Sequence, residues 1–313
     1  MTKIEEVAAQ IRDVLNDSTI AKTRIFTNKS KGFWDQLWTS LDTIGDTEVA
    51  IKSFSEMSEQ DFKKVAYIIT YGLLQALYLQ QDAVSHLKES ILGTKITWLK
   101  EYPDVHFVRT IRNESTGHPT KNDHNPLKTN IYAVINRNTI SKTGFSYMIW
   151  VLGKAETKNV KFNELIKAQE ESLHTELSSI LESIQESEHE HKKSFKGEKL
   201  AEILPSGEPY SLSLIRQVYY DELAWIIFLG FKEKYELIKQ KIEDRYGPLK
   251  QTLRIPGTEL LLTELDRIFL RIEEFKKVGK DVEIDIGIYA DALVEKIKEL
   301  KTHLEEIDEE FNE

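Results

Sequence analysis

The stretch SEQDFKKVAYIITYGLLQALYLQQDAVSHLKESILG, from Ser58 to Gly93, carries the clearest helical pattern in the chain. Ser58 is a favoured helix N-cap, an acidic residue follows three positions later, and Gly93 is a favoured residue just past a helix end. Apolar side chains recur every three or four positions: Phe62, Val65, Ala66, Ile69, Leu73, Ala76, Leu77, Val84, Leu87 and Ile91. They cover much of the circumference, which predicts a long, central and buried helix. Gln81 and Asp82 are expected at solvent-exposed positions.

The rest of the chain has the same character, which predicts a mainly α fold built as a helical bundle. Further helices are expected over 4–15, 33–44, 162–191, 214–246, 258–278 and 284–311, with a polar loop over 16–30. Two segments rich in β-branched and aromatic residues, Ile131–Ile135 and Phe145–Val151, flank the turn Lys142–Gly144. They predict a β-hairpin inserted at about 130–152.

A stretch rich in turn-forming residues divides the chain. Pro205-Ser206-Gly207-Glu208-Pro209 lies within the segment 193–213, which is typical of a linker. We therefore expect a first helical domain with the hairpin over 1–192, a linker over 193–213 and a C-terminal helical region over 214–313. The longest apolar run, Ala224–Phe231, is far too short to span a bilayer and is interpreted as part of a buried helix.

Composition and charge exclude several classes of protein. The 313 residues include no cysteine, which excludes disulfides, thiolate metal sites and cysteine nucleophiles and suits the cytoplasm, where we expect the protein. The first residues lack the apolar core of a signal peptide.

The net charge of −10 argues against a broad basic face for nucleic acid. In the tract Glu188-His189-Glu190-His191, residues two apart do not share a helix face, so no metal ion or other cofactor is expected.

A second stretch, VRTIRNESTGHP from Val108 to Pro119, brings polar and titratable residues together. On a helical wheel, Arg112, Asn113 and Thr116 lie within about 60° of Arg109, which defines a polar face. The helix that carries this face is expected to begin near Pro103, a residue suited to the first helical turn.

His118 would point away from that face if the helix continued through it. Gly117 favours the left-handed conformation that ends helices, and Pro119 disfavours helical backbone at the residue before it. We therefore expect the helix to end at Gly117 and His118 to turn back toward Arg112.

An arginine and a histidine together need no metal ion to cleave RNA. The guanidinium group offers a planar set of donors to phosphate, and the imidazole can move a proton near neutral pH. Arg109, Thr116 and Lys121 are candidate substrate-binding residues around this pair. Residues 95–145 contain eight Lys and Arg against four Asp and Glu, which gives a local charge of +4 in an acidic chain.

The sequence Arg112-Asn113-Glu114-Ser115-Thr116-Gly117-His118 resembles the signature of the HEPN superfamily, an arginine followed after four to six residues by a histidine. The resemblance implies a helical bundle and, for many members, a metal-independent endoribonuclease of toxin or phage-defence systems. It also implies that Arg112 and His118 are the catalytic pair, with Asn113 as the residue that orients them. A homodimer that brings two motifs into one cleft is implied too, as is a protein antitoxin or other partner.

A second class of function fits the same residues. A non-catalytic helical module that binds RNA, a nucleotide or another protein would have the same amphipathic helices and acidic C-terminus. In that case, the polar face of Arg109, Arg112 and Asn113 is expected to be open to solvent or tied into salt bridges.

Overall fold

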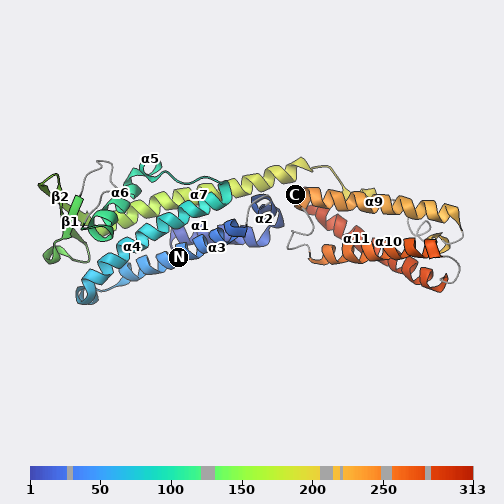
Figure 1. The fold of residues 1–313 in the computed structure, drawn as a ribbon, viewed down its shortest axis with the longest axis horizontal. Helices are drawn as coiled ribbons and strands as arrows, with labels where there is room; N and C mark the ends of the chain where they lie inside the picture. Colours follow the sequence, from blue (N-terminus) through green and yellow to red (C-terminus); the bar gives the residue numbers. More distant parts are fainter. Residues whose placement is uncertain are drawn as a thin grey trace. The chain divides into compact units, whose positions relative to one another are not determined.

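The computed structural model describes residues 1–26, 31–120, 131–204, 214–218, 221–247, 256–278 and 283–312. They form a mainly α protein with one small antiparallel sheet, which confirms the expected fold class (Figure 1). The chain divides into two compact units: unit 1 contains residues 1–16 and 28–184, and unit 2 contains residues 17–27 and 185–313. No helix within the described ranges is both long and apolar enough to cross a membrane.

Unit 1 is a bundle of long helices with two short ones. They are α1 (Lys3–Asp17), α3 (Lys31–Glu56), α4 (Glu59–Leu92), α5 (Trp98–Glu101), α6 (Pro103–Arg112) and the part of α7 (Phe162–Ser194) that extends to Ile184. The helix α3 packs along α4 and is much longer than the expected helix over 33–44.

The helix α4 confirms the predicted ends. The N–H of Asp61 donates to Ser58 Oγ at 3.1 Å, and Gly93 adopts a left-handed φ of 75° just past the last turn. Burial is far more extensive along the second half of the helix, where Leu79 and Leu92 are still 41% and 40% exposed. In the first half, Val65 departs from helical backbone angles and the side chain of Ile68 is 73% exposed.

A buried polar chain links the helices of unit 1 and corrects the expectation for Gln81, which is fully buried. Gln81 Nε2 donates to the backbone oxygen of Val105 at 3.2 Å and to Gln169 Oε1 at 2.7 Å. Gln169 Nε2 donates in turn to Gln80 Oε1 at 2.7 Å, and Gln80 Nε2 donates to Glu48 Oε1. These hydrogen bonds lower the cost of burying the three amides, although Gln81 Oε1 has no hydrogen-bond partner among the described residues.

This burial makes the stability of the protein depend on the protonation of Glu48. Burial raises the pKa of its carboxyl above the ordinary value of 4.5, against the opposing hydrogen bonds from Thr2 and Gln80. The folded state therefore binds more protons than the unfolded state in this range, so the free energy of unfolding falls as pH rises from 4.5 through the folded-state pKa. We expect Glu48→Gln to remove this component, measured by urea unfolding at several pH values. Glu56→Gln, an exposed substitution on the same helix, is the control, and an unchanged slope in Glu48→Gln would contradict the assignment.

The sheet of unit 1 contains β1 (Ile131–Ile135), β2 (Gly144–Val151) and β3 (Lys154–Lys161) in the order β1-β2-β3. Ile131 pairs with Val151 and Ile135 with Tyr147, which confirms the hairpin; η2 (Arg137–Thr139) lies in its connection. The third strand was not expected, because its sequence is polar and rich in lysine. It follows a two-residue turn in which Leu152 and Gly153 both have positive φ, the geometry that favours a tight hairpin.

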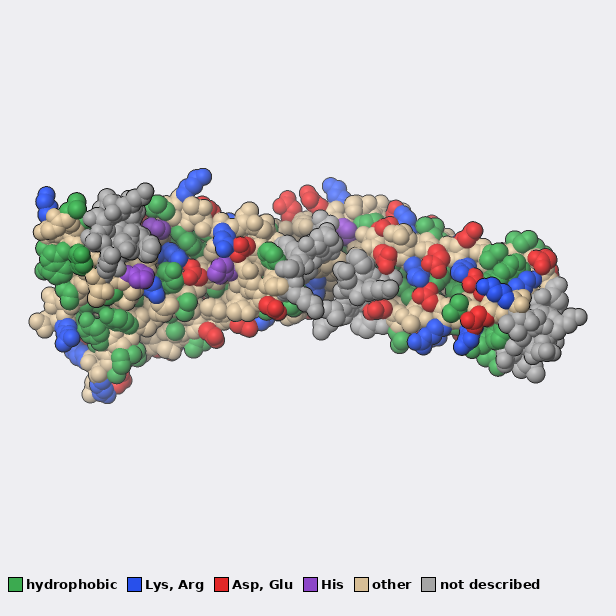
Figure 2. Space-filling model, in the orientation of Figure 1, with side chains coloured by type: hydrophobic (Ala, Val, Ile, Leu, Met, Phe, Trp, Pro, Cys, Tyr) green, Lys and Arg blue, Asp and Glu red, His purple; other side chains and the backbone are tan. Residues whose placement is uncertain are grey.

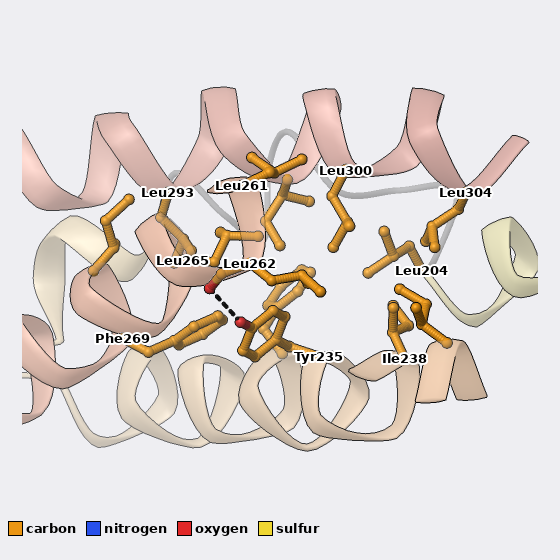
Figure 3. Packing of buried hydrophobic residues seen from close by; sticks show 14 of the residues in the cluster. Leu204, Tyr235, Ile238, Leu261, Leu262, Leu265, Phe269, Leu293, Leu300 and Leu304 are labelled. Carbon is orange, nitrogen blue, oxygen red and sulfur yellow. Dashed lines mark hydrogen bonds between the residues drawn. The ribbon is translucent and has the colours of Figure 1, made fainter. Parts of the chain in front are cut away.

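Unit 2 contains α2 (Thr19–Phe26), η3 (Leu200–Ile203), η4 (Ile215–Gln217), α9 (Glu222–Tyr246), α10 (Pro256–Val278) and α11 (Glu283–Asn312). Its core lies between the three long helices (Figure 3). The ring of Tyr235 stacks on Phe269 at 4.9 Å between centroids, and its hydroxyl donates to the backbone oxygen of Leu262 at 2.7 Å.

Three sequence expectations are corrected in unit 2. A polar loop was expected over 16–30, but this segment contains the helix α2. The side chains of Ile20 and Ile25 on this helix are buried. The helix expected over 214–246 begins only at Glu222, because Asp221 caps it by accepting from the N–H of Leu223 at 2.8 Å. The apolar run 224–231 is not wholly buried, since Ile226 is 63% exposed.

The proposed domain boundaries stay a prediction. Within the expected linker, Leu200 and Leu204 are buried in the core of unit 2, and residues 205–213 lie outside the described ranges.

Candidate functional site

Two arginines of α6 lie over one aromatic ring of α4. The Cζ atoms of Arg109 and Arg112 are 4.2 Å and 4.5 Å from the centroid of the Tyr78 ring, within range for cation–π attraction. Arg109 Nη1 also donates to Asp82 Oδ1 at 2.8 Å. Asp82, expected at an exposed position, is therefore half-buried in an ion pair.

The guanidinium group of Arg112 is held from two sides. Its Nε and Nη2 donate to Gln75 Oε1 at 3.1 Å and 2.8 Å, and its Nη1 donates to Asn113 Oδ1 at 3.0 Å. Both partners are neutral, so Arg112 keeps its full positive charge while its orientation is fixed. The Asn113 side chain thus helps to hold Arg112 in one orientation.

The helix ends at Gly117 by a mechanism that differs from the expected one. Residues Asn113–Gly117 form a π-helical turn, η1, in which the N–H of His118 donates to the backbone oxygen of Asn113 at 2.8 Å. Gly117 does not adopt the left-handed conformation. The helical backbone ends with this wider turn, and His118 follows with φ −133° and an exposed side chain.

Arg112 lies directly against this turn. A Cβ atom built on Gly117 would lie 2.7 Å from Arg112 Nη1. The Cα atoms of Gly117 and His118 are about 3.8 Å apart, as in any trans peptide. Arg112 Nη1 is therefore within about 8 Å of the Cα of His118. Among the described residues, none makes a side-chain hydrogen bond or ion pair with the His118 imidazole.

Glu114 anchors the turn to the sheet, a role that the sequence did not predict. Its carboxylate is buried and accepts from Tyr147 Oη of β2 at 2.7 Å. Lys158 Nζ of β3 donates to the same carboxylate at 2.9 Å. Burial and the Glu114 charge raise the pKa of the Tyr147 hydroxyl, so it stays protonated and donating. The sheet therefore holds the backbone between Arg112 and His118.

The other candidate site residues that the structure describes make no contact that links them to both Arg112 and His118. Thr116 Oγ1 donates to the backbone oxygen of Arg112 at 3.0 Å, so its hydroxyl proton is engaged within the turn. Lys121 lies outside the described residues. His106, which sequence reasoning missed, lies one turn before Arg109 on α6, and burial and the Arg109 charge lower its pKa. Figure 2 shows histidine and basic side chains close together on the part of unit 1 that carries α6.

The close contact between Arg112 and Gly117 gives a specific prediction. In Gly117→Ala, the added methyl group must shift the guanidinium that Gln75 and Asn113 hold, and misplacing a reacting group by about 1 Å can cost on the order of 100-fold in rate. For the RNA cleavage that the HEPN resemblance implies, we expect a fall of at least tenfold with an unchanged thermal midpoint. Gly72→Ala on α4 is the control, because a Cβ atom built on Gly72 would meet nothing within 4 Å. Full activity in Gly117→Ala would show that the orientation of Arg112 is not needed.

Comparisons with known proteins give no match: no family model fits the chain, and neither curated proteins nor solved structures resemble it closely enough to be matched.

Proposed function

We propose that the protein is an endoribonuclease of the toxin or phage-defence type, which cleaves RNA without a metal ion through Arg112 and His118. The observation that carries the proposal is the position of the Arg112 guanidinium against Gly117, one residue before His118. An imidazole reaches several ångströms from its Cα, so one phosphodiester group can contact both side chains. The hydrogen bonds from Arg112 to Gln75 and Asn113 support the same role, because they fix a cation in advance of the reaction.

The chemistry assigns one role to each residue. His118 accepts the proton of a ribose 2′-hydroxyl, and the 2′-oxygen attacks the adjacent phosphorus as the bond to the 5′-oxygen breaks. Arg112 stabilises the negative charge on the non-bridging oxygens. The leaving 5′-oxygen takes a proton from a second acid, which the His118 of a second copy supplies in the homodimer that the resemblance implies. The products are a 2′,3′-cyclic phosphate and a 5′-hydroxyl.

Incubating end-labelled single-stranded RNA with the protein in excess chelator tests this proposal, since unpaired bases are accessible to proteins. The expected products carry 2′,3′-cyclic phosphate ends, and Arg112→Ala and His118→Ala abolish them. Products with 3′-hydroxyl ends, or cleavage that stops in chelator, would contradict the mechanism. Equal activity of the two variants and the wild type would remove these residues from it.

A second function is favoured by one specific observation. Arg109 forms an ion pair with Asp82, so one of the two arginine charges on this face is neutralised. A non-catalytic module that binds RNA, a nucleotide or a protein does not need both charges to be free. In that case, the same assay shows RNA retained on a filter without cleavage, and Arg112→Ala weakens retention only.

A further inference from the structure

The outward face of α9 in unit 2 carries large apolar side chains that no described part of the chain covers. Leu223, Ile226 and Leu237 are 60%, 63% and 47% exposed, and Leu229 is exposed between them. Next to these side chains, a Cβ atom built on Gly230 would meet nothing within 4 Å. A helix that is apolar on both faces is normally buried on both, which indicates that another segment packs here.

The charges along this exposed stripe have one sign. Its exposed charged residues are Glu222, Glu233, Glu236 and Asp244, and no exposed position of α9, all of whose residues are described, carries Lys or Arg. Glu222 lies 3.1 Å from Lys276 and Glu236 lies 3.6 Å from Lys239, whereas Glu233 has no ion-pair partner among the described residues.

The lysines of α9 are turned to the flanks of the helix. Lys232 pairs with Glu273, Lys239 with Asp266 and Lys241 with Glu198 at 3.0 Å, while Lys234 lies 6.0 Å from the centroid of the Phe231 ring. The cations are thus used within unit 2, and the stripe presents apolar groups with carboxylates on it and at its edge. Figure 2 shows hydrophobic side chains among charged ones on the face of unit 2 that it draws.

We propose that this stripe, Leu223–Leu237, binds a basic amphipathic helix of a partner protein. Apolar side chains spaced every three or four residues would pack on Leu223, Ile226 and Leu229, and flanking lysines or arginines would pair with Glu233 and Glu236. A second copy of α9 would place carboxylates against carboxylates, and an anionic membrane would be repelled, so charge favours the basic helix over both. This binding does not depend on the nuclease proposal.

The test uses the full chain and two designed 21-residue peptides. Both peptides repeat leucine at helical spacing; one carries lysine at the flanking positions and the other carries glutamate. Fluorescence anisotropy is expected to show binding of the lysine peptide only, with an affinity that falls as salt is raised. Glu233→Gln/Glu236→Gln and Ile226→Gln are each expected to weaken it at least tenfold.

Leu270→Gln, which changes an exposed leucine on α10, is the matched control and is expected to bind as the wild type does. Circular dichroism confirms that each variant is folded. Equal binding of the glutamate peptide, or undiminished binding by Ile226→Gln, would overturn the proposal. So would a wild-type dimer in sedimentation that Ile226→Gln converts to a monomer, because a second copy would then be the occupant.

Discussion

Replacing Arg112 with lysine is expected to lower the rate of RNA cleavage about 100- to 1000-fold, the usual cost of losing one fixed donor to a developing oxyanion. Lysine keeps the charge but lacks the planar group that Gln75 and Asn113 hold. Single-turnover cleavage in chelator measures the effect. Arg137→Lys is a matched control, because Arg137 also lies over a tyrosine ring of α4, at 5.8 Å from the Tyr67 centroid, but outside α6 and η1.

His118→Gln is expected to lose a similar or larger factor, since general acid–base catalysis typically contributes about 100- to 10,000-fold. If both side chains act on one phosphate, the double variant loses little more than the worse single variant. Simple multiplication of the two losses would indicate that they act independently. A fully active Arg112→Lys would refute the role given to the guanidinium.

The second large effect concerns the buried ion pair of unit 2. Asp308→Ala is expected to lower the free energy of unfolding by about 3–5 kcal/mol, because it leaves the buried Arg245 charge without its partner. Arg245 Nη1 donates to Asp308 Oδ1 at 2.9 Å, and the two side chains are 0% and 10% exposed. The same carboxylate also accepts the backbone N–H groups of Leu200 and Ala201 at 2.8 Å and 3.0 Å. Its loss therefore frees donors of η3 as well.

Urea unfolding of the full chain measures this loss. The matched control is Asp291→Ala, which breaks the exposed pair with Arg216 and is expected to have a much smaller effect. Asp308→Asn is expected to fall between the two, because the amide oxygen can still accept hydrogen bonds. Equal effects of Asp308→Ala and Asp291→Ala would show that burial does not amplify the Arg245–Asp308 interaction.

The sequence predicted those features that depend on interactions between residues close together in the chain. The cap at Ser58, the stop at Gly93, the start of α6 at Pro103 and the pairing of β1 with β2 follow from residue types at short separations. These features need no knowledge of distant contacts, so one sequence is sufficient to predict them.

Features that depend on distant partners were missed. Gln81 looked like a surface residue because its partner Gln169 is 88 positions away. No role was predicted for Glu114, because its partners Tyr147 and Lys158 lie on strands that follow it. The lysine-rich β3 is stabilised by pairing with β2 rather than by its own composition. In the site, the sequence predicted a helix end at Gly117 but assigned it to a left-handed glycine, because a π-helical turn has no recognised sequence signal.

The central claim is that Arg112 and His118 contact the same phosphate group. The most direct measurement is the NMR spectrum of the protein with labelled histidine, titrated with a 2′-deoxy oligouridylate that binds but cannot be cleaved. The His118 resonance is identified by its loss in His118→Gln. This resonance is expected to shift on titration, and the shift is expected to be lost in Arg112→Ala. A His118 resonance that stays unchanged while the oligonucleotide binds, or that shifts equally in Arg112→Ala, would contradict the central claim.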